Sequence, residues 1–331
     1  MRVDQTAKGQ IRTLRGHCDF LGCGVTYQAK LVRGDLPPPA FEGTRTCDTL
    51  VCLPTYNEGE TIGPLIDAIL RLPVKTDVMI VDDRSLDGTR AAVDLRAAAD
   101  ARVRVIGRPR KLGIGSAHRL GWLHARRLGY TRIVTLDADL SHDPADIPRL
   151  LAALDRGADV AVASRFAPGG RIDYRGFRLV ISRGANLLAR RLLRLSLSEH
   201  TTSLRAARLD RVPPGLVETI DHEGYSFFIA CITRLVRAGL KVTEIPIHFH
   251  DRQQGKSKLP PIEIVRGFFT VVGLALPGRG AGSFRSLPDC EGACPSCKLP
   301  YCVPSEEGPR CLACQSGRTS APLGKMKSDG A

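Results

Sequence analysis

Apolar runs typical of buried strands alternate with amphipathic segments of helical length over residues 49–277. Repeated strand–helix alternation builds a parallel sheet whose crossover helices cover both faces. The pattern therefore predicts an α/β fold with a mostly parallel, doubly covered sheet. The expected strands are Leu50–Leu53, Asp77–Val81, Val103–Ile106, Thr131–Leu136, Asp159–Ala163 and Lys241–Phe249. The expected helices between the first five strands are Glu60–Leu72, Asp87–Ala99, Ser116–Leu128 and Pro144–Asp155.

Two carboxylates, Asp137 and Asp139, directly follow one of these strands, with the small residue Ala138 between them. Ligands of open α/β sheets bind at the carboxyl ends of the strands. Mg²⁺ and Mn²⁺ prefer oxygen ligands of this kind together with substrate phosphates. A solvated acidic pair is the plain alternative, because a single Asp-x-Asp is weak evidence for a metal.

Two other strands deliver polar groups to the same edge. The first ends in Pro54–Glu58 and the second in Val81–Thr89, which contains three aspartates. Anionic side chains are costly to bury without partners, so three such strand ends at one edge indicate a ligand site.

Taken in order, Pro54–Glu58, Val81–Thr89 and Asp137–Pro144 resemble the three motifs of family 2 glycosyltransferases, which have the GT-A fold. Later segments resemble the polyprenol-phosphate mannose synthase branch of that family, over about Leu50 to Val272. These segments are Ala163–Phe166, Gly169-Gly170, Ser182–Asn186, Asp251-Arg252, Gly255 and Ser257-Lys258.

The resemblance implies a Rossmann-like GT-A enzyme that depends on Mg²⁺ or Mn²⁺, with Asp137 and Asp139 as metal ligands and Ser141 as a further candidate. It implies contacts of Tyr56 and Glu58 with the base and ribose. It implies catalytic roles for Asp139, Arg165 and Arg252. It implies nucleotide-sugar binding by Pro54, Tyr56, Glu58, Asp83, Asp137, Arg183 and Lys258.

The implied reaction is transfer of a sugar, mannose in that branch, from a donor such as GDP-mannose to a polyprenyl or dolichyl phosphate. A phosphate acceptor is already anionic at neutral pH and needs no general base. The alternative within the family is a saccharide or other hydroxyl acceptor in cell-surface glycan synthesis, which needs a base. Glu199, His200 and Glu223 are the nearby candidates for that base, although surface or capping roles are expected for them.

Several residues depart from the family pattern. Arg84 stands where relatives usually carry glycine, so the turn is expected to differ there. Residues 201–205 read Thr-Thr-Ser-Leu-Arg in place of Thr-Ser-Gly-Phe-Arg, and Glu199 stands where aspartate is expected. Gly224–Ile229 lacks the usual glutamine. These differences leave the expected donor chemistry in place and leave the identity of the acceptor open.

The formal net charge of +14 favours anionic partners. Arg178–Leu195 alternates apolar residues with arginines, and Ile262–Leu276 is a second apolar segment. Such helices either lie on an anionic membrane or pack against the core with a solvated face. No run reaches the length needed to span a bilayer, so a peripheral location on the cytoplasmic face of the membrane is expected.

Six of the eleven cysteines fall between Cys290 and Cys314. Two Cys-x-x-Cys pairs, formed by Cys294, Cys297, Cys311 and Cys314, predict a structural Zn²⁺ in a small ribbon-like module at residues 287–316. The predicted divisions are a poorly ordered extension 1–48, the glycosyltransferase domain 49–277, a linker 278–286, this module and a disordered tail 317–331. A zinc-ribbon protein that binds nucleic acid or protein is the alternative of another class. Nucleic acid is disfavoured because the basic residues are spread over the α/β region and the tail has few aromatics. The oligomeric state is left open.

Overall fold

The computed structural model describes residues 45–220, 222, 224–251 and 261–276, although not the side chains of residues 177, 178 and 261–266. It also describes the backbone of two antiparallel strand pairs. These are β1 (Ile11–Cys18) with β2 (Val25–Val32), and β12 (Cys302–Ser305) with β13 (Gly308–Cys311). Cys294, Cys297 and Cys314 lie outside the described residues, as do the linker, the tail and the side chain of Cys311. The zinc module and the predicted divisions therefore stay predictions.

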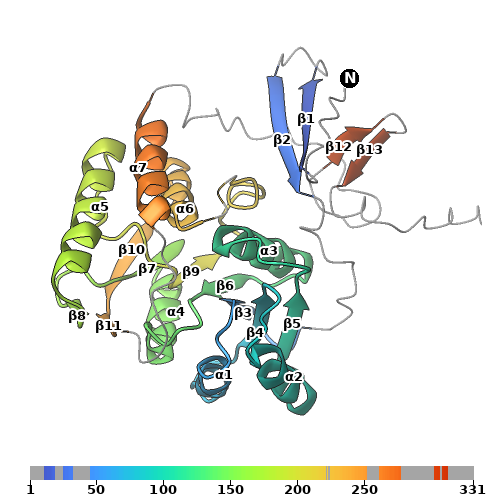
Figure 1. Ribbon diagram of the computed structural model, residues 1–331, viewed down its shortest axis with the longest axis vertical. Helices are drawn as coiled ribbons and strands as arrows, with labels where there is room; N and C mark the ends of the chain where they lie inside the picture. Colours follow the sequence, from blue (N-terminus) through green and yellow to red (C-terminus); the bar gives the residue numbers. More distant parts are fainter. Residues whose placement is uncertain are drawn as a thin grey trace, which may run out of the picture.

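A seven-stranded sheet forms the centre of the fold, in the order β10-β7-β9-β6-β3-β4-β5 (Figure 1). Six strands are parallel, and β9 alone runs antiparallel to its neighbours β6 and β7. The strand bounds are β3 Thr49–Thr55, β4 Asp77–Asp82, β5 Val103–Gly107, β6 Arg132–Thr135, β7 Val160–Ser164, β9 Arg205–Arg208 and β10 Val242–Pro246. The predicted mostly parallel sheet is confirmed.

Alternate strand residues pack into two separate cores, one on each face of the sheet. Leu50 and Met79 pack on one face with helices α3 (Ile114–Arg127) and α6 (Ser226–Arg237). Val51 and Ile80 pack on the other face with α1 (Ile62–Leu70) and α4 (Ile147–Asp155), which follows the 3₁₀ turn η2 (Pro144–Asp146). Helix α2 (Thr89–Ala99) lies beside α1 (Figure 1). The sheet is therefore covered on both sides, as expected.

Helices α5 (Phe177–Leu193) and α7 (Pro261–Ala275) share a small third core made by Ala189, Leu193 and Val271 together with Ile229 of α6. Figure 1 shows both helices at one side of the sheet. A short parallel pair, β8 (Arg171–Ile172) and β11 (His248–Phe249), lies below them in this view. Within the described part of the chain, no helix is both long enough and apolar enough to cross a bilayer.

Several elements differ from the sequence-based expectation. The expected strand Lys241–Phe249 is divided at Pro246 into β10, which pairs with β7, and β11, which pairs with β8. Helix α6 was not predicted, because its residues from Ser226 to Thr233 are all buried and a continuous apolar run of this length is also compatible with a strand.

The backbone at Arg84 keeps a conformation suited to glycine. Its φ angle is 58°, in the left-handed region, and its guanidinium donates a hydrogen bond to the carbonyl of Pro109 (3.2 Å). The left-handed conformation costs a non-glycine residue about 1 kcal/mol. We expect Arg84→Gly to raise the free energy of unfolding by about 1 kcal/mol, measured by urea denaturation. Arg90→Gly in α2 is the control and should lower it by a similar amount. A loss of stability in Arg84→Gly would contradict this reading of the turn.

Candidate active site

The register of the sheet brings three loops to one edge. Thr55 pairs with Asp82, and Cys52 pairs with Thr135, so β3, β4 and β6 end side by side. The loop after each strand contains a non-glycine residue with a positive φ: Asn57 (55°), Arg84 (58°) and Leu140 (59°). Such conformations cluster at ligand sites, where the surrounding contacts hold them. The three motifs predicted from the sequence thus meet along one edge of the sheet.

Backbone-to-side-chain hydrogen bonds join the first two loops. Asn57 N donates to Ser85 Oγ (2.8 Å), Leu86 N donates to Asn57 Oδ1 (3.0 Å), and Glu58 N donates to Thr89 Oγ1 (2.8 Å). These bonds satisfy main-chain groups of both loops, so each loop holds the other in place. Tyr56 and Glu58, the predicted base and ribose contacts, are carried on this joined pair.

Asp83 is buried and holds the next loop in place. It forms an ion pair with Arg108 and accepts hydrogen bonds from the backbone N–H groups of Leu112 and Gly113, each at 3.1 Å. Burial raises the pKa of Asp83, and the Arg108 charge opposes that shift. Asp83 therefore fixes the start of α3, a task in addition to the nucleotide-sugar binding predicted for it.

Lys111 was missed in the sequence. It is exposed, and its ammonium lies 4.1 Å from the centre of the Tyr56 ring, where a cation–π contact is favourable. The signal was present, because the basic run Arg108–Lys111 directly follows the expected strand Val103–Ile106 and so reaches the same edge. A cation there suits an anionic ligand beside Tyr56.

The acidic pair lies where predicted, just beyond β6. Asp139 is buried and accepts a hydrogen bond from Ser141 N (3.0 Å), and Ser141 O accepts one from His250 N (3.0 Å). Asp137 is half-buried. Two carboxylates on one turn provide the hard oxygen donors that suit Mg²⁺ or Mn²⁺. The residues present therefore fit the predicted divalent metal.

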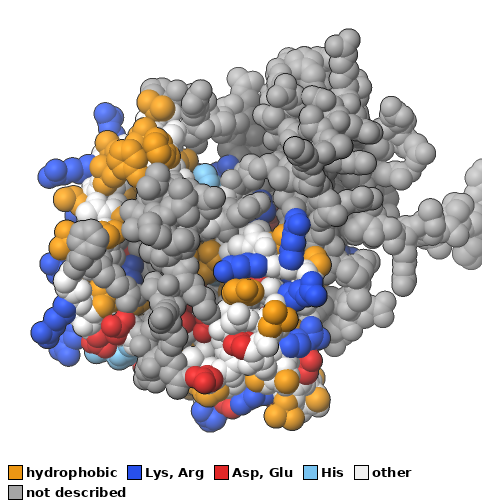
Figure 2. Space-filling view, viewed as in Figure 1, with side chains coloured by type: hydrophobic (Ala, Val, Ile, Leu, Met, Phe, Trp, Pro, Cys, Tyr) orange, Lys and Arg blue, Asp and Glu red, His pale blue; other side chains and the backbone are white. Residues whose placement is uncertain are grey.

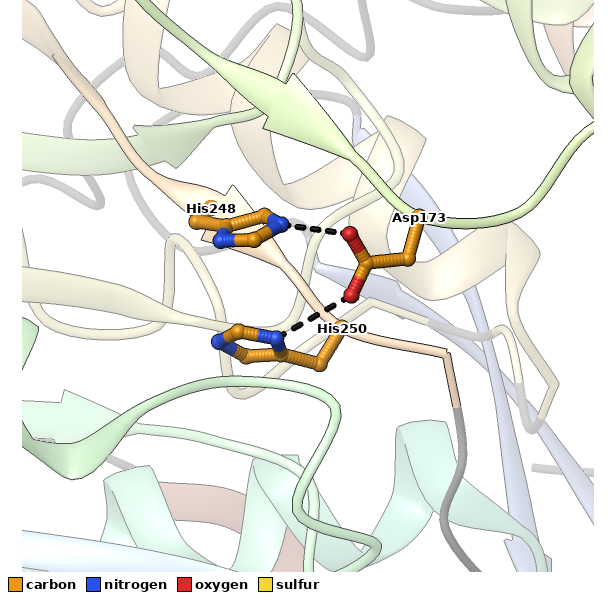
Figure 3. A group of neighbouring side chains, drawn as sticks. All are labelled: Asp173, His248 and His250. Atoms are coloured by element: carbon orange, nitrogen blue, oxygen red, sulfur yellow. Dashed lines mark hydrogen bonds and ion pairs between the residues drawn. The ribbon is translucent and has the colours of Figure 1, made fainter.

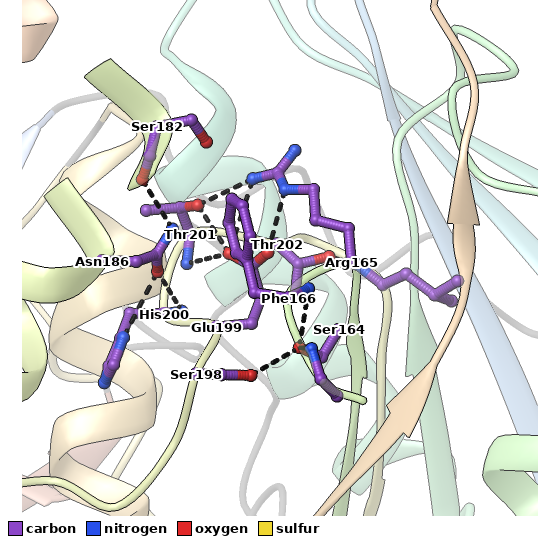
Figure 4. A network of polar contacts seen from close by, with 12 residues as sticks. Ser164, Arg165, Phe166, Ser182, Asn186, Ser198, Glu199, His200, Thr201 and Thr202 are labelled. Atoms are coloured by element: carbon purple, nitrogen blue, oxygen red, sulfur yellow. Dashed lines mark hydrogen bonds and ion pairs between the residues drawn. The ribbon is translucent and has the colours of Figure 1, made fainter. Parts of the chain in front are cut away.

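Arg165, which follows β7, is held by a buried ion pair (Figure 4). Its Nε lies 2.9 Å from Glu199 Oε2, and its Nη2 donates to Thr201 Oγ1 (2.9 Å). Its guanidinium also lies over the Phe249 ring, 4.6 Å from the ring centre. Burial raises the pKa of Glu199, but the Arg165 charge and hydrogen bonds from Thr201 outweigh it, and the pKa lies below its ordinary value. The Glu199 carboxylate is therefore charged at neutral pH.

The segment that carries Glu199 is fixed at both ends. Glu244 of β10 accepts hydrogen bonds from the backbone N–H groups of Ser198 and Glu199, each at 2.9 Å. Asn186 of α5 accepts one from His200 N (2.7 Å) (Figure 4). Two independent elements thus set the position of the Arg165–Glu199 pair.

The expectation of surface or capping roles for Glu199 and His200 was wrong, because both are fully buried. Burial lowers the pKa of His200 to about 4, so the ring is neutral at neutral pH. The sequence missed His142, which is also buried and whose pKa burial lowers to about 4; its ring contacts that of Phe249 edge-on. Glu223 lies outside the described residues.

The remaining predicted site residues do not all lie at this edge of the sheet. Pro54 is buried at the end of β3, and Arg183 is exposed on α5. Arg252 and Lys258 lie outside the described residues, so their roles stay predictions. The structure thus brings the loops that carry Tyr56 and Glu58 to the same edge as the acidic pair, and it leaves the roles predicted for Arg183, Arg252 and Lys258 untested.

Comparison with known proteins identifies the family. A model described as glycosyl transferase family 2 matches residues 50–210. Polyprenol monophosphomannose synthase of Mycolicibacterium smegmatis is 38% identical over 233 residues, which cover 70% of this chain and 88% of that protein. The chain belongs to glycosyltransferase family 2. A second relative, undecaprenyl-phosphate mannosyltransferase of Micrococcus luteus, is 39% identical over 215 residues, 63% of this chain and 86% of that protein.

The glycosyltransferase domain has the GT-A-like α/β fold. The family match runs from β3 to just beyond β9 and so contains all three loops of the ligand edge and Arg165. Among solved structures, the crystal structure of a mycobacterial protein superposes with a TM-score of 0.50 at 23% identity, covering 69% of this chain and 74% of that one. That similarity bears on the fold alone. The predicted fold class and the assignment as a glycosyltransferase are confirmed.

Proposed function

We propose that this glycosyltransferase moves mannose from a nucleotide sugar such as GDP-mannose to a polyprenyl phosphate, with Mg²⁺ or Mn²⁺ held by Asp137 and Asp139. One observation carries the proposal: the acidic pair lies on the ligand edge of a chain that is 38% identical to most of a polyprenol monophosphomannose synthase. The second relative is named as a mannosyltransferase that acts on undecaprenyl phosphate.

On the donor side, the first two loops present Tyr56 and Glu58, and Lys111 places a positive charge beside the Tyr56 ring. These groups suit a nucleotide base, its ribose and the nearby phosphates. A divalent cation at the acidic pair stabilises the negative charge that develops on the departing diphosphate. The chain's own task is to hold the donor so that its sugar carbon faces the acceptor.

The state of Glu199 favours a phosphate acceptor over a hydroxyl. A hydroxyl acceptor needs a base that can take its proton. Glu199 is instead paired with Arg165 and bonded to Thr201, and these contacts lower its pKa below the ordinary value. His200 and His142 are buried, with pKa values of about 4. A phosphate that is already anionic requires none of these groups as a base.

An exposed surface on α5 and α7 is suited to a membrane. Val180 and Leu187 of α5 are exposed and stand seven residues apart, with the exposed Arg183 and Arg190 three residues after each. On α7, Phe268 and Phe269 are also exposed, with 49% and 66% of their surface accessible. Figure 2 shows hydrophobic side chains gathered over α7 and the neighbouring part of α5, with basic side chains around them.

This combination fits an anionic lipid surface. Aromatic and aliphatic side chains enter the acyl boundary while arginines contact lipid phosphates. A polyprenyl phosphate is itself held in a membrane, so the enzyme must approach one. We therefore place the protein peripherally on the cytoplasmic face of the membrane, through the α5–α7 surface.

The variant Phe268→Asp/Phe269→Asp tests this surface. Full burial of one phenylalanine contributes about 1.5–3 kcal/mol, so we expect partitioning onto vesicles with anionic lipid to fall more than tenfold. Leu95→Asp is the matched control, because Leu95 is 70% exposed on α2, away from this surface, and should leave partitioning unchanged. Co-sedimentation measures the effect. Equal binding by the double variant and the wild type would contradict the assignment.

The donor is tested by calorimetric titration with GDP-mannose, UDP-glucose and UDP-N-acetylglucosamine in the presence of Mn²⁺. The proposal predicts that GDP-mannose binds most tightly and that Lys111→Ala weakens its binding. Arg110→Ala, an exposed cation one residue earlier, is the control. Tighter binding of a UDP-sugar would overturn the assigned donor and retain the glycosyltransferase.

A further inference from the structure

A group of three potential metal ligands lies outside the acidic pair. Asp173 follows β8, His248 begins β11, and His250 follows it. One ligand atom from each residue lies within 4.8 Å of the other two. Figure 3 shows the two imidazole rings facing the two oxygens of the same carboxylate.

The distances approach those of a metal site. His248 Nε2 lies 2.5 Å from Asp173 Oδ1, and His250 Nδ1 lies 3.2 Å from Asp173 Oδ2. The two histidine ring centres are 4.2 Å apart. Tetrahedral zinc with bonds of about 2.0–2.1 Å places its ligand atoms about 3.3 Å from one another. Small side-chain rotations therefore suffice to surround an ion.

The backbone holds these residues in place. Asp173 N donates to Phe249 O (3.1 Å), which fixes the carboxylate residue against the segment that carries both histidines. His248 in β11 and His250 just after it are two residues apart, a spacing that puts side chains on the same side of a strand. The ligands are thus set by strand pairing and not by a loose surface loop.

Charge and access also suit a cation. All three side chains are partly exposed, so an ion can enter from solvent. Asp146 lies near enough to His250 for the two to interact electrostatically, which adds negative potential. Among described residues, this is the one group of three or more histidine, cysteine or acidic side chains whose ligand atoms converge in this way.

We propose that Asp173, His248 and His250 bind a Zn²⁺ ion that is separate from the metal of the sugar donor. Two imidazoles and one carboxylate are a zinc ligand set that leaves a fourth position for water. Mg²⁺, which avoids nitrogen ligands, is a poor occupant. The inference goes beyond the proposed function and does not depend on it.

The position of this site gives the ion a structural task. His250 N bonds to Ser141 O, two residues from Asp139, and Phe249 lies under the Arg165 guanidinium. An ion bound by both histidines and Asp173 joins β8 to β11 and so steadies the segment on which the Asp139 turn and Arg165 rest. Zinc binding is therefore expected to stabilise the folded enzyme.

The test compares full-length wild type with His248→Gln/His250→Gln, using Zn²⁺ as the only added metal. After dialysis, the double variant should retain one zinc equivalent fewer than wild type, and its affinity at this site should fall by more than about a hundredfold. His222→Gln, a histidine outside the group, is the matched control and should retain every equivalent. Circular dichroism establishes that each variant is folded.

X-ray absorption spectroscopy of the wild type distinguishes zinc bound by sulfur atoms of the cysteine-rich segment from zinc bound by Asp173, His248 and His250. The proposal predicts nitrogen and oxygen scatterers for one zinc equivalent and their loss in the double variant. Equal zinc content in wild type and double variant would overturn it. A spectrum that contains sulfur ligands alone would also overturn it, and it would do so whatever the outcome of the sugar-transfer assays.

Discussion

Replacing Asp139 with asparagine is expected to lower kcat/KM for sugar transfer about a thousandfold or more while the protein stays folded. Asparagine has the same shape and retains an oxygen that can accept the hydrogen bond from Ser141 N, so the turn is preserved. The change removes one of the two negative charges that hold the divalent ion. Loss of the ion's stabilisation of the departing diphosphate is worth several kcal/mol, and each 1.4 kcal/mol is about tenfold in rate.

The measurement is initial-rate kinetics with saturating Mn²⁺, together with Mn²⁺ binding followed by electron paramagnetic resonance. Asp94→Asn is the matched control, because Asp94 is an exposed carboxylate on α2 that pairs with Arg90 (2.7 Å). Loss of this ion pair should lower the free energy of unfolding by a few tenths of a kcal/mol and leave the rate of sugar transfer unchanged. If Asp139→Asn kept more than a tenth of the wild-type rate, the metal role of this residue would be wrong.

Removing the carboxylate of Glu199 is expected to produce the largest loss of stability. Glu199 is fully buried and pairs with Arg165, whose side chain is itself nearly buried. Breaking a buried pair from one side leaves the other charge without compensation, which costs about 3–5 kcal/mol. Glu199→Ala should therefore lower the free energy of unfolding by that amount, measured by urea denaturation.

A double-mutant cycle separates the ion pair from simple packing. Arg165→Met removes the cation, and the double variant Arg165→Met/Glu199→Ala should be more stable than the sum of the two single losses predicts. The expected coupling is about 1–3 kcal/mol. Strictly additive losses would show that the pairing of these two charges contributes nothing to the fold.

The same pair gives a pH dependence of definite sign. Because the folded-state pKa of Glu199 lies below its ordinary value of 4.5, its contribution is fully present above that value. The contribution is lost as the pH falls through the depressed folded-state pKa. The stability difference between wild type and Glu199→Gln should therefore shrink below about pH 4.5 and stay constant between about pH 6 and 8. A difference that grew on acidification would contradict the lowered pKa.

The sequence predicted the parallel strands, because the spacing of apolar residues that marks a strand or a helix can be read from a short segment. It also predicted the edge at which the acidic pair lies, because the carboxyl ends of parallel strands all meet at one edge of the sheet. It did not predict β9, since an antiparallel strand of four residues with two alanines carries no distinctive period. Helix α6 was also missed, because its buried apolar run Phe227–Ile232 is equally compatible with a strand.

Within the site, residues next to a strand end could be found from the sequence, and contacts between residues far apart along the chain could not. Asp137, Asp139 and Tyr56 belong to the first kind. The sequence named Glu199 as a candidate base but did not predict its ion pair, because its partner Arg165 lies 34 positions earlier and α5 lies between the two in the chain. The Asp173–His248–His250 group likewise depends on the pairing of β8 with β11.

The most direct test of the proposed function is an acceptor comparison with GDP-mannose and Mn²⁺. Polyprenyl phosphate is set against the matched polyprenol, which has the same chain with a hydroxyl in place of the phosphate. The account predicts a mannosylated lipid from the phosphate, no product from the alcohol, and loss of the product in Asp139→Asn. Equal or faster transfer to the alcohol would contradict it, because that reaction needs a base that the buried, arginine-paired Glu199 does not supply.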